Sequence, residues 1–501
     1  MHPIDLSIVV IYAAGLICLG KYLTTRRTTV QDYFLAGRAL PWWTVMLSIV
    51  ATETSTITLI SIPGYSFTND FSFLQIAFGY AIGRLIISYT LLPSYFEGRI
   101  YTAYQFLGAR LGAAAGKCAA SLFLITRNLS DGLRLFGSAL VITMVMAGAP
   151  NSIVPVDQSI LLVAIVLIVI VTLIYTWLGG MTAVIWTDVL QMTIYVSGGI
   201  IAVVLLLKPI TTDPFTVGRQ LYEAGKLSVF DFRFNLSLDY TFWSGIFGGA
   251  FFTAASHGTD QMFVQRYLCC RSLKDAQRAL IGSGLIVVAQ FFLFLAIGSL
   301  LSAHYDALSS IKPAQQALST FSSDRIFPLF IASSFPIGLK GLMLAAVIAA
   351  AMSTLSSSLN SSAATLVGDI YARGTAKTDV NLGVIKLSRW STVLFAILQT
   401  LVAFFATGLS DRLIDNVLRI QFFTGGVMLG VFFISVCFRS MQPAWVVVSC
   451  ACSVLLLAFL ALATSISWQW YTLIGSLLAI CIAWAASALF PPESKSTSAC
   501  Y

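Results

Sequence analysis

The sequence predicts an all-α polytopic membrane protein. Its hydrophobic fraction is 58% and its charged fraction only 10%, whereas a soluble domain has about 25% charged residues. Apolar runs of about 20 residues recur along the whole chain, and each can cross about 30 Å of hydrocarbon. Backbone groups in lipid must bond within the protein, so only helices or a closed barrel can span. Because the runs are continuous and do not alternate, helices are expected.

Thirteen spans are expected. The first has no basic segment before it, so we interpret it as a retained span rather than a signal peptide. All belong to one transmembrane domain, 1–490, and the polar segment 491–501 is expected to be a cytoplasmic tail. The expected ranges are 4–22, 42–65, 72–97, 118–147, 158–178, 182–206, 241–265, 279–302, 338–361, 389–408, 415–437, 443–465 and 468–490.

The basic residues predict the orientation. They are about twice as frequent in the segments that follow odd-numbered spans, and such segments are cytoplasmic under the positive-inside rule. This set includes Arg266, Arg271, Lys274 and Arg278. We therefore expect the N-terminus outside and the C-terminus in the cytoplasm, with the chain in a bacterial inner (plasma) membrane. Topology explains the net charge of +8, and no basic stripe remains for nucleic acid.

Two spans are interrupted by polar residues. In 42–65 the polar run 51–56 falls near mid-membrane, and Pro63-Gly64 is expected to end the span. In 241–265 three glycines, Gly245 and Gly248-Gly249, precede a polar stretch that runs from 257 to 261. The two lie five spans apart, as in an inverted repeat whose broken helices bind ions at the midplane. Ordinary kinked helices are the alternative.

Four groups of motifs resemble the sodium:solute symporter family, which includes sodium/glucose, sodium/sialic acid and sodium/proline cotransporters. They lie at 32–43, at 175–191, at 265–277 and at 350–361. The resemblance implies a LeuT-type fold with a five-plus-five inverted repeat. The repeats would be 42–206 and 241–437, with one extra helix before them (4–22) and two after them (443–490). Gly425-Gly426-Val427 departs from the pattern, because many relatives have a proline near Val427.

Sodium sites are suggested by a polar stripe and a carboxylate within predicted spans. Ala350, Ser353, Ser356, Ser357 and Asn360 are spaced to share one helix face. Sodium prefers oxygen ligands, although small hydroxyl residues also favour helix packing. A carboxylate near mid-membrane costs about 2.5 to 3.5 kcal/mol, and a bound cation would offset that cost. Asp188 is such a carboxylate.

The family resemblance implies specific ligands. A principal sodium would be bound by the carbonyls of Ala51, Thr54 and Ala350 and the hydroxyls of Ser353 and Thr354. A second sodium would be bound by Asp188, Ser353, Ser356 and Ser357. The solute would contact Glu53, Ser55, Thr58, Phe73, Gln75, Asp131, Asp260 and Gln261. Alternatively, the acidic members of this last set form internal ion pairs with Arg84, Arg127 or Arg134.

These observations predict a sodium-coupled symporter for a small polar organic solute, namely a sugar, polyol, organic acid or amino-acid-like compound. We expect Na⁺ and the solute as partners and a functional monomer in the bilayer. No enzyme motif such as a metalloprotease helix or phosphate loop is present, so an enzyme is not expected. The alternatives are a proton-coupled symporter, with Glu53 or Asp188 as proton carrier, and a passive channel or facilitator.

Overall fold

The computed structural model describes residues 2–23, 30–97, 100–147, 158–208, 214–307, 323–371, 382–406, 413–437 and 441–489. Within these ranges every regular element is helical, as predicted. The elements are α1 (Pro3–Tyr22), α2 (Val30–Leu35), η1 (Ala36–Arg38), α3 (Trp42–Glu53), α4 (Thr56–Thr68), α5 (Leu74–Tyr89), α6 (Leu91–Phe96), α7 (Ala103–Leu111), α8 (Ala113–Ala147), α9 (Gln158–Leu207), α10 (Pro214–Glu223), η2 (Ser244–Gly248), α11 (Gly249–Thr259), α12 (Gln261–Leu268), α13 (Leu273–Ala307), η3 (Ser323–Arg325), α15 (Ile326–Ser334), α16 (Leu339–Thr365), η4 (Leu366–Tyr371), α17 (Leu382–Phe405), α18 (Leu413–Cys437), α19 (Pro443–Ala463), η6 (Trp468–Trp470) and α20 (Tyr471–Leu489).

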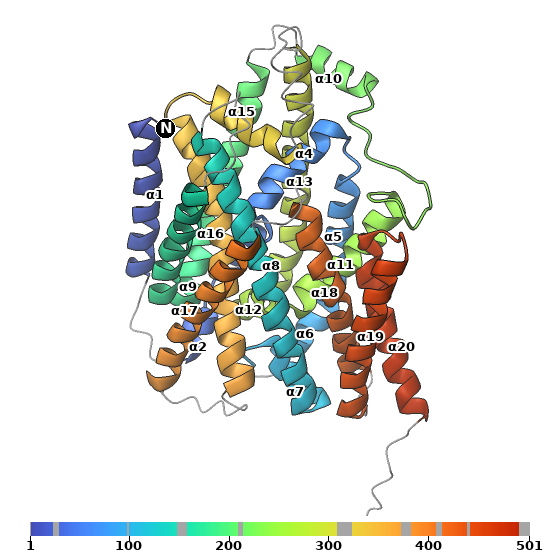
Figure 1. Ribbon diagram of the computed structural model, residues 1–501. Helices are drawn as coiled ribbons and strands as arrows, with labels where there is room; N and C mark the ends of the chain where they lie inside the picture. Colours follow the sequence, from blue (N-terminus) through green and yellow to red (C-terminus); the bar gives the residue numbers. More distant parts are fainter. Residues whose placement is uncertain are drawn as a thin grey trace, which may run out of the picture.

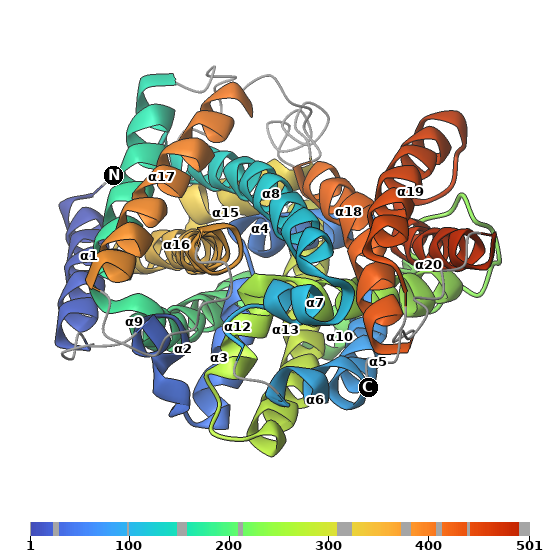
Figure 2. The same cartoon turned by 90° about the horizontal axis from the view of Figure 1, so that it is seen from below.

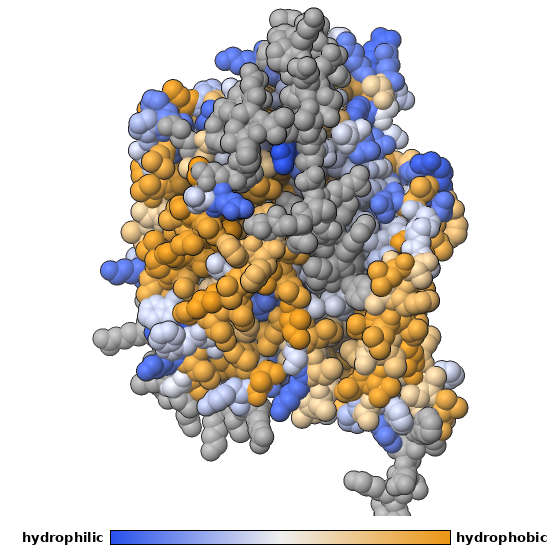
Figure 3. Space-filling model, viewed as in Figure 1, coloured by the Kyte–Doolittle hydropathy of each residue, from blue (hydrophilic) through white to orange (hydrophobic). Residues whose placement is uncertain are grey.

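The longer helices stand side by side, and hydrophobic residues form a broad belt across the surface between more hydrophilic ends (Figures 1 and 3). Among the described residues eight helices are long and apolar enough to cross a membrane, or nine with the bent pair α3 and α4. Every expected range overlaps helical structure, but the count of thirteen spans stays a prediction. α9 covers two expected spans, and Gly180 divides it with φ 52° and ψ −154°, a conformation that glycine adopts most readily.

The first interrupted span consists of α3 and α4, which meet at an angle of 64°. Thr54 is extended, with φ −83° and ψ 96°, and the next residue, Ser55, caps α4 by accepting a bond from Thr58 N. The prediction that Pro63-Gly64 ends this span was wrong, because α4 continues to Thr68. The helix beyond Pro63 is attached to α13, because Ser66 Oγ donates to the Leu295 carbonyl at 2.8 Å and Gly298 leaves room for the Pro63 carbonyl.

The second interrupted span breaks at Asp260, between α11 and α12. This residue is also extended, with φ −81° and ψ 122°, and its carboxylate caps α12 by accepting a hydrogen bond from Met262 N at 2.8 Å. The π-helical turn η2 precedes α11 and contains the predicted glycines Gly245 and Gly248. Each of the two spans that the sequence marks as interrupted therefore has an extended residue at its break.

α16 is the most deeply buried of the candidate spans in the described chain, and Figure 2 shows it end-on among its neighbours, which include α8, α9, α12 and α17. From Gly341 to Thr365 nearly every residue is buried. Three hydrogen bonds connect it to the broken span: Thr56 Oγ1 donates to the Val347 carbonyl at 2.9 Å, Thr354 Oγ1 donates to the Thr52 carbonyl at 3.2 Å, and the hydroxyls of Thr52 and Ser357 are 3.2 Å apart. The polar stripe of α16 thus faces the break.

Candidate functional site

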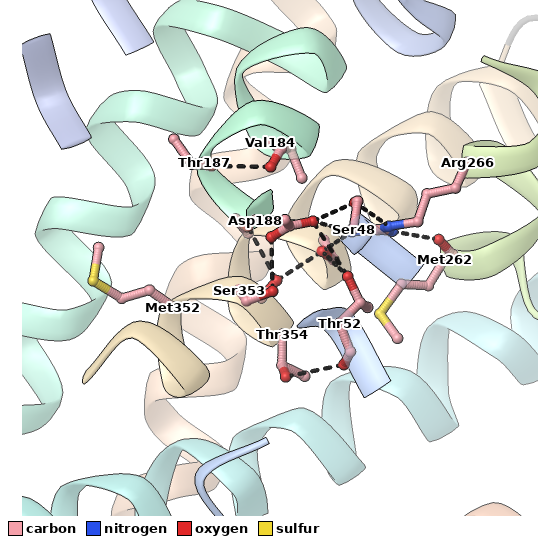
Figure 4. Close-up of polar contacts among 12 residues, drawn as sticks. Ser48, Thr52, Val184, Thr187, Asp188, Met262, Arg266, Met352, Ser353 and Thr354 are labelled. Atoms are coloured by element: carbon pink, nitrogen blue, oxygen red, sulfur yellow. Dashed lines mark hydrogen bonds and ion pairs between the residues drawn. The ribbon is translucent and has the colours of Figure 1, made fainter. Parts of the chain in front are cut away.

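Asp188 on α9 is fully buried and bonded by hydroxyls from two other helices (Figure 4). Ser353 Oγ on α16 donates to Oδ1 at 2.7 Å, and Ser48 Oγ on α3 donates to Oδ2 at 2.6 Å. Thr52 Oγ1 lies 3.4 Å from the same Oδ2. The structure thus brings Asp188 to the polar stripe on which sodium binding was predicted.

Arg266 on α12 supplies the opposite charge. Its Nη2 lies 2.9 Å from Asp188 Oδ2 and also bonds to the Ser357 hydroxyl, while its Nε donates to Ser48 Oγ at 2.9 Å. Nη1 donates to the Met262 carbonyl at 2.6 Å. Arg266 is completely buried, so it is not one of the cytoplasmic loop charges among which the sequence placed it. A buried carboxylate needs such a partner, because an unpaired buried charge is strongly destabilising.

The two oxygens of Asp188 have different surroundings. Oδ2 is shared by Arg266, Ser48 and Thr52, whereas the one hydrogen bond to Oδ1 in the described chain comes from Ser353. The hydroxyl of Ser356 donates to the Ser353 carbonyl at 3.1 Å. A hydroxyl that donates in this way keeps its lone pairs and can still bind a cation.

The predicted principal sodium ligands lie at the break of the first interrupted span. Ala51, Thr54, Ala350, Ser353 and Thr354 are all buried. The regular helix bonding of α3 ends where Thr54 N donates to the Val50 carbonyl at 3.0 Å. In a continuous helix Thr58 N would bond to the Thr54 carbonyl, but here it bonds to Ser55 Oγ at 3.4 Å. The break therefore removes the helical partner of the Thr54 carbonyl, two residues after the Thr52 carbonyl that Thr354 Oγ1 contacts.

Three adjoining cavities lie beside the break, and the largest of these three, called the large cavity, has a volume of about 70 Å³. Four predicted solute contacts line it, namely Glu53, Ser55, Thr58 and Phe73. Its remaining walls come mainly from α4, α8 and α11 and combine aromatic with charged side chains. They are Ile57, Ile62, Tyr80, Arg127, Arg134, Phe252, Ser256, His257, Phe263 and Phe291.

Glu53 belongs to a buried charged network at this cavity. It forms an ion pair with Arg84, which also donates to Ser283 Oγ at 2.8 Å. His257 Nε2 lies 3.3 Å from Arg84 Nη2, and His257 Nδ1 lies 2.6 Å from the Tyr267 hydroxyl. The Arg84 side chain is 0% exposed and that of Glu53 is 16% exposed. The carboxylate therefore faces the cavity while its counter-ion is behind it.

A second charged network lies along α8. Asp131 Oδ2 is 3.3 Å from Arg127 Nε, and its Oδ1 is 3.5 Å from Arg134 Nη1. Arg127 Nη2 is also 3.5 Å from Asp260 Oδ2. Asp131 does not line the large cavity, but Arg127 and Arg134 do. These carboxylates are thus ion-pair partners of the arginines, as one of the two interpretations of the sequence proposed.

Two further cavities adjoin the first. One of about 50 Å³ shares Arg127, Phe252 and Ser256 with it and continues past Asp260 to Tyr104 on α7. The other, about 10 Å³, lies between Ser55, Asp131 and Thr354 and has room for roughly one water molecule. Ser55 therefore lines the large cavity and also the small one beside the predicted sodium ligand Thr354.

Two predicted solute contacts lie elsewhere. Gln75 Nε2 donates to the Tyr240 carbonyl at 2.7 Å, and its Oε1 accepts from Asp231 N at 3.3 Å. Gln261 accepts from Ala103 N at 2.8 Å. Neither amide lines a described cavity. They instead attach α5 to the segment before α11, and α12 to the start of α7.

Several site residues were not predicted. Ser48 and Arg266 bond to Asp188, and Gln290 donates to Thr54 Oγ1 at 2.6 Å. Phe252 and Ser256 line both of the two larger cavities at the break. A usable signal existed only for Arg266, because a buried aspartate in a charge-poor chain requires a nearby cation. The others carry no sequence pattern that separates them from packing residues.

The chain as a whole is similar to known sodium-coupled transporters. The chain is 29% identical over 488 residues to the sodium/sialic acid symporter SiaT of Proteus mirabilis, covering 97% of this chain and 95% of that protein. It is 26% identical to a sodium/glucose cotransporter of Vibrio parahaemolyticus, covering 99% and 92%. A solved Na⁺-coupled sialic acid symporter, substrate-bound and outward-open, superposes with a TM-score of 0.85 at 28% identity, covering 98% and 99%. The profile of the sodium:solute symporter family matches residues 33–444, and the chain belongs to that family.

Proposed function

We propose that the protein is a symporter that uses the inward sodium gradient to import a small polar organic solute across a bacterial inner membrane, and that it works as a single chain. The observation that carries this proposal is the break between α3 and α4: the Thr52 carbonyl before it accepts from Thr354, and Ser55 after it lines both the charged cavity and the small cavity beside Thr354. Hydroxyls and free carbonyls suit sodium. The N-terminus lies outside and the C-terminus in the cytoplasm, as the basic residues predict.

The Asp188 cluster is proposed as a second sodium site. Arg266 neutralises the carboxylate through Oδ2, and Oδ1 with the hydroxyls of Ser353 and Ser356 is left for the ion. One sodium crossing 100 mV yields about 2.3 kcal/mol, and each 1.4 kcal/mol is tenfold. Two ions could therefore concentrate a neutral solute about a thousandfold on the membrane potential alone.

Sodium dependence is tested with purified protein in proteoliposomes, using radiolabelled solutes. The double variant Ser353→Ala/Thr354→Ala should lose sodium-driven uptake and sodium-induced thermal stabilisation, because both hydroxyls at the break are removed. Ser333→Ala/Ser334→Ala is the matched control, since it removes two exposed hydroxyls from α15 and should leave uptake unchanged. Unaltered sodium affinity in the first variant would contradict the site.

The same assay separates the alternatives. A proton-coupled symporter would accumulate solute when choline replaces sodium and a pH gradient is imposed, whereas a facilitator would equilibrate solute without either gradient. The ion pair of Glu53 with buried Arg84 opposes a proton-carrying role for this carboxylate, because the guanidinium stabilises its charged form.

A further inference from the structure

We propose, building on the symporter function above, that the solute is a small zwitterion that carries one cationic amino group and one carboxylate. One carboxylate and two guanidiniums line the large cavity, and because Arg127 is only 3% exposed, the two more accessible groups carry opposite charges. Glu53 at the break of the first interrupted span is 16% exposed, and Arg134 on α8 is 14% exposed. Both side chains line the same cavity.

Each of these two groups has a counter-ion that the solute cannot reach. Arg84 behind Glu53 is 0% exposed, and Asp131 behind Arg134 is 1% exposed. The buried partners keep Glu53 and Arg134 ionised inside the membrane and leave part of each available to a ligand. The cavity wall therefore has a fixed acceptor of hydrogen bonds at one place and a fixed donor at another.

The charges around the cavity are balanced. Glu53, Asp131 and Asp260 are paired with the three guanidiniums of Arg84, Arg127 and Arg134. A zwitterion adds no net charge to this network, and its two ends complement the two exposed groups. A purely anionic solute would satisfy Arg134 but meet Glu53 with the wrong sign, and an uncharged sugar would use neither charge fully.

The rest of the wall limits the size and character of the solute. The aromatic side chains of Phe73, Tyr80, Phe252 and Phe291 surround a volume of about 70 Å³. Such a wall favours a short apolar body between the two charged ends. The proposed class is therefore small amino acids and related amino carboxylates, and charge complementarity provides the selectivity.

The test is a panel of solutes matched in size and differing in one charged group, measured by sodium-dependent thermal stabilisation and by uptake in proteoliposomes. L-Alanine is compared with L-lactate and L-alaninol, and 4-aminobutyrate is compared with 4-hydroxybutyrate and 4-aminobutanol. Glucose and N-acetylneuraminate represent the solutes of the two relatives. At least one zwitterion should bind tenfold or more tightly than both of its analogues.

Two variants assign the ends. Glu53→Gln/Arg84→Gln, which removes both charges of one pair, should weaken zwitterion binding at least tenfold and leave that of the matched anion unchanged. Arg134→Gln should weaken the zwitterion and the anion alike. Arg219→Gln removes an arginine from an exposed ion pair on α10 and should change neither. Sodium-induced stabilisation without solute verifies that each variant is folded. If neither variant is folded, the panel of solutes measured with the unaltered protein decides whether the solute is a zwitterion.

Several results would overturn the proposal. The first is that an anion, glucose or N-acetylneuraminate binds as tightly as every zwitterion in the panel. The second is that no zwitterion stabilises the protein or is taken up. Sodium-dependent uptake of one of those other solutes would refute the zwitterion and keep the symporter function. Loss of sodium dependence for every transported solute would refute the function itself.

Discussion

The carboxylate of Asp188 shows how one buried residue can serve two purposes. Through Oδ2 it pairs with Arg266, and this pair joins α9 to α12 in the interior. Through Oδ1 it faces Ser353 on α16. Replacing Asp188 by asparagine would leave Arg266 buried without its counter-charge, and removing one partner of such a pair costs about 3 to 5 kcal/mol. That variant therefore cannot separate loss of an ion site from loss of stability.

Ser356→Ala is a cleaner test of the second sodium site. Its hydroxyl donates to the Ser353 carbonyl within α16, so its removal leaves the pair of Asp188 and Arg266 intact. We expect the ratio of sodium to solute, read from reversal potentials in proteoliposomes, to fall from two to one. Ser361→Ala is the control, because its hydroxyl makes the same kind of bond to the Ser358 carbonyl at 3.1 Å. An unchanged ratio at normal turnover would remove the second site.

At the scale of single residues, the sequence could predict those polar residues that are costly to place inside a membrane. Asp188 and the hydroxyl stripe could be recognised because polar groups need a reason to lie in a span. Gln75 could not be placed, because an amide serves equally well as a solute contact or as a bond to the Tyr240 carbonyl. Arg266 was misplaced, since a basic residue near a span end resembles a loop charge until its burial is known.

At the scale of helices, α5 packs against η2 and α11 through glycines on both sides. A side chain at Gly79 would collide with the Gly245 and Ile246 carbonyls, and one at Gly83 would collide with the Ala250 carbonyl. A side chain at Gly249 would come within 2.7 Å of the Ile76 carbonyl. Both partners have glycines four residues apart, the spacing that lets membrane helices approach closely. This contact supports α11, which carries Ser256 and His257 to the cavity.

Gly83→Ala should therefore destabilise the protein by about 1 to 3 kcal/mol, the usual cost of overpacking, because the added methyl group meets rigid backbone. Thermal unfolding in detergent would measure the effect as a lower midpoint. Gly15→Ala on α1 is the matched control, since a side chain there meets nothing within 4 Å. In that variant alanine should leave stability unchanged or raise it by up to about 1 kcal/mol. Equal effects of both substitutions would show that the close contact is unimportant.

The existence of the helices was predicted well, because the length and pattern of the apolar runs determine where a helix can form. Their ends and breaks were less predictable, since these depend on tertiary contacts. Pro63 does not end α4, whose last turn is attached to α13 by the bond from Ser66 Oγ to the Leu295 carbonyl, and no local pattern reveals that partner. The break at Asp260, by contrast, lies inside the polar stretch that the sequence indicated.

At the scale of the whole molecule, the two larger of the three cavities around the break follow each other along α8. Arg134 lines the first, Phe123 lines the second and Arg127 lines both. The twelve residues from Phe123 to Arg134 span about 16 Å of helix. Phe252 and Ser256 complete the shared wall. With the proposed orientation, the second cavity lies nearer the cytoplasm than the first, and this shared wall stands between it and the proposed solute site.

Sodium and solute should influence each other through the break of the first span. Thr354 contacts the Thr52 carbonyl, and Ser55 lines both the small cavity beside Thr354 and the large cavity. An ion that orders residues 52–55 would also fix Glu53 at the cavity wall. Sodium should then tighten solute binding, and linkage requires that the solute tighten sodium binding by the same factor, about 5- to 150-fold in typical cases.

Calorimetric titration of each ligand with and without the other measures both factors. In Ser353→Ala/Thr354→Ala the coupling should vanish while solute affinity without sodium is retained. Two ligands that bind independently in the unaltered protein would show that the break does not connect the ion to the solute.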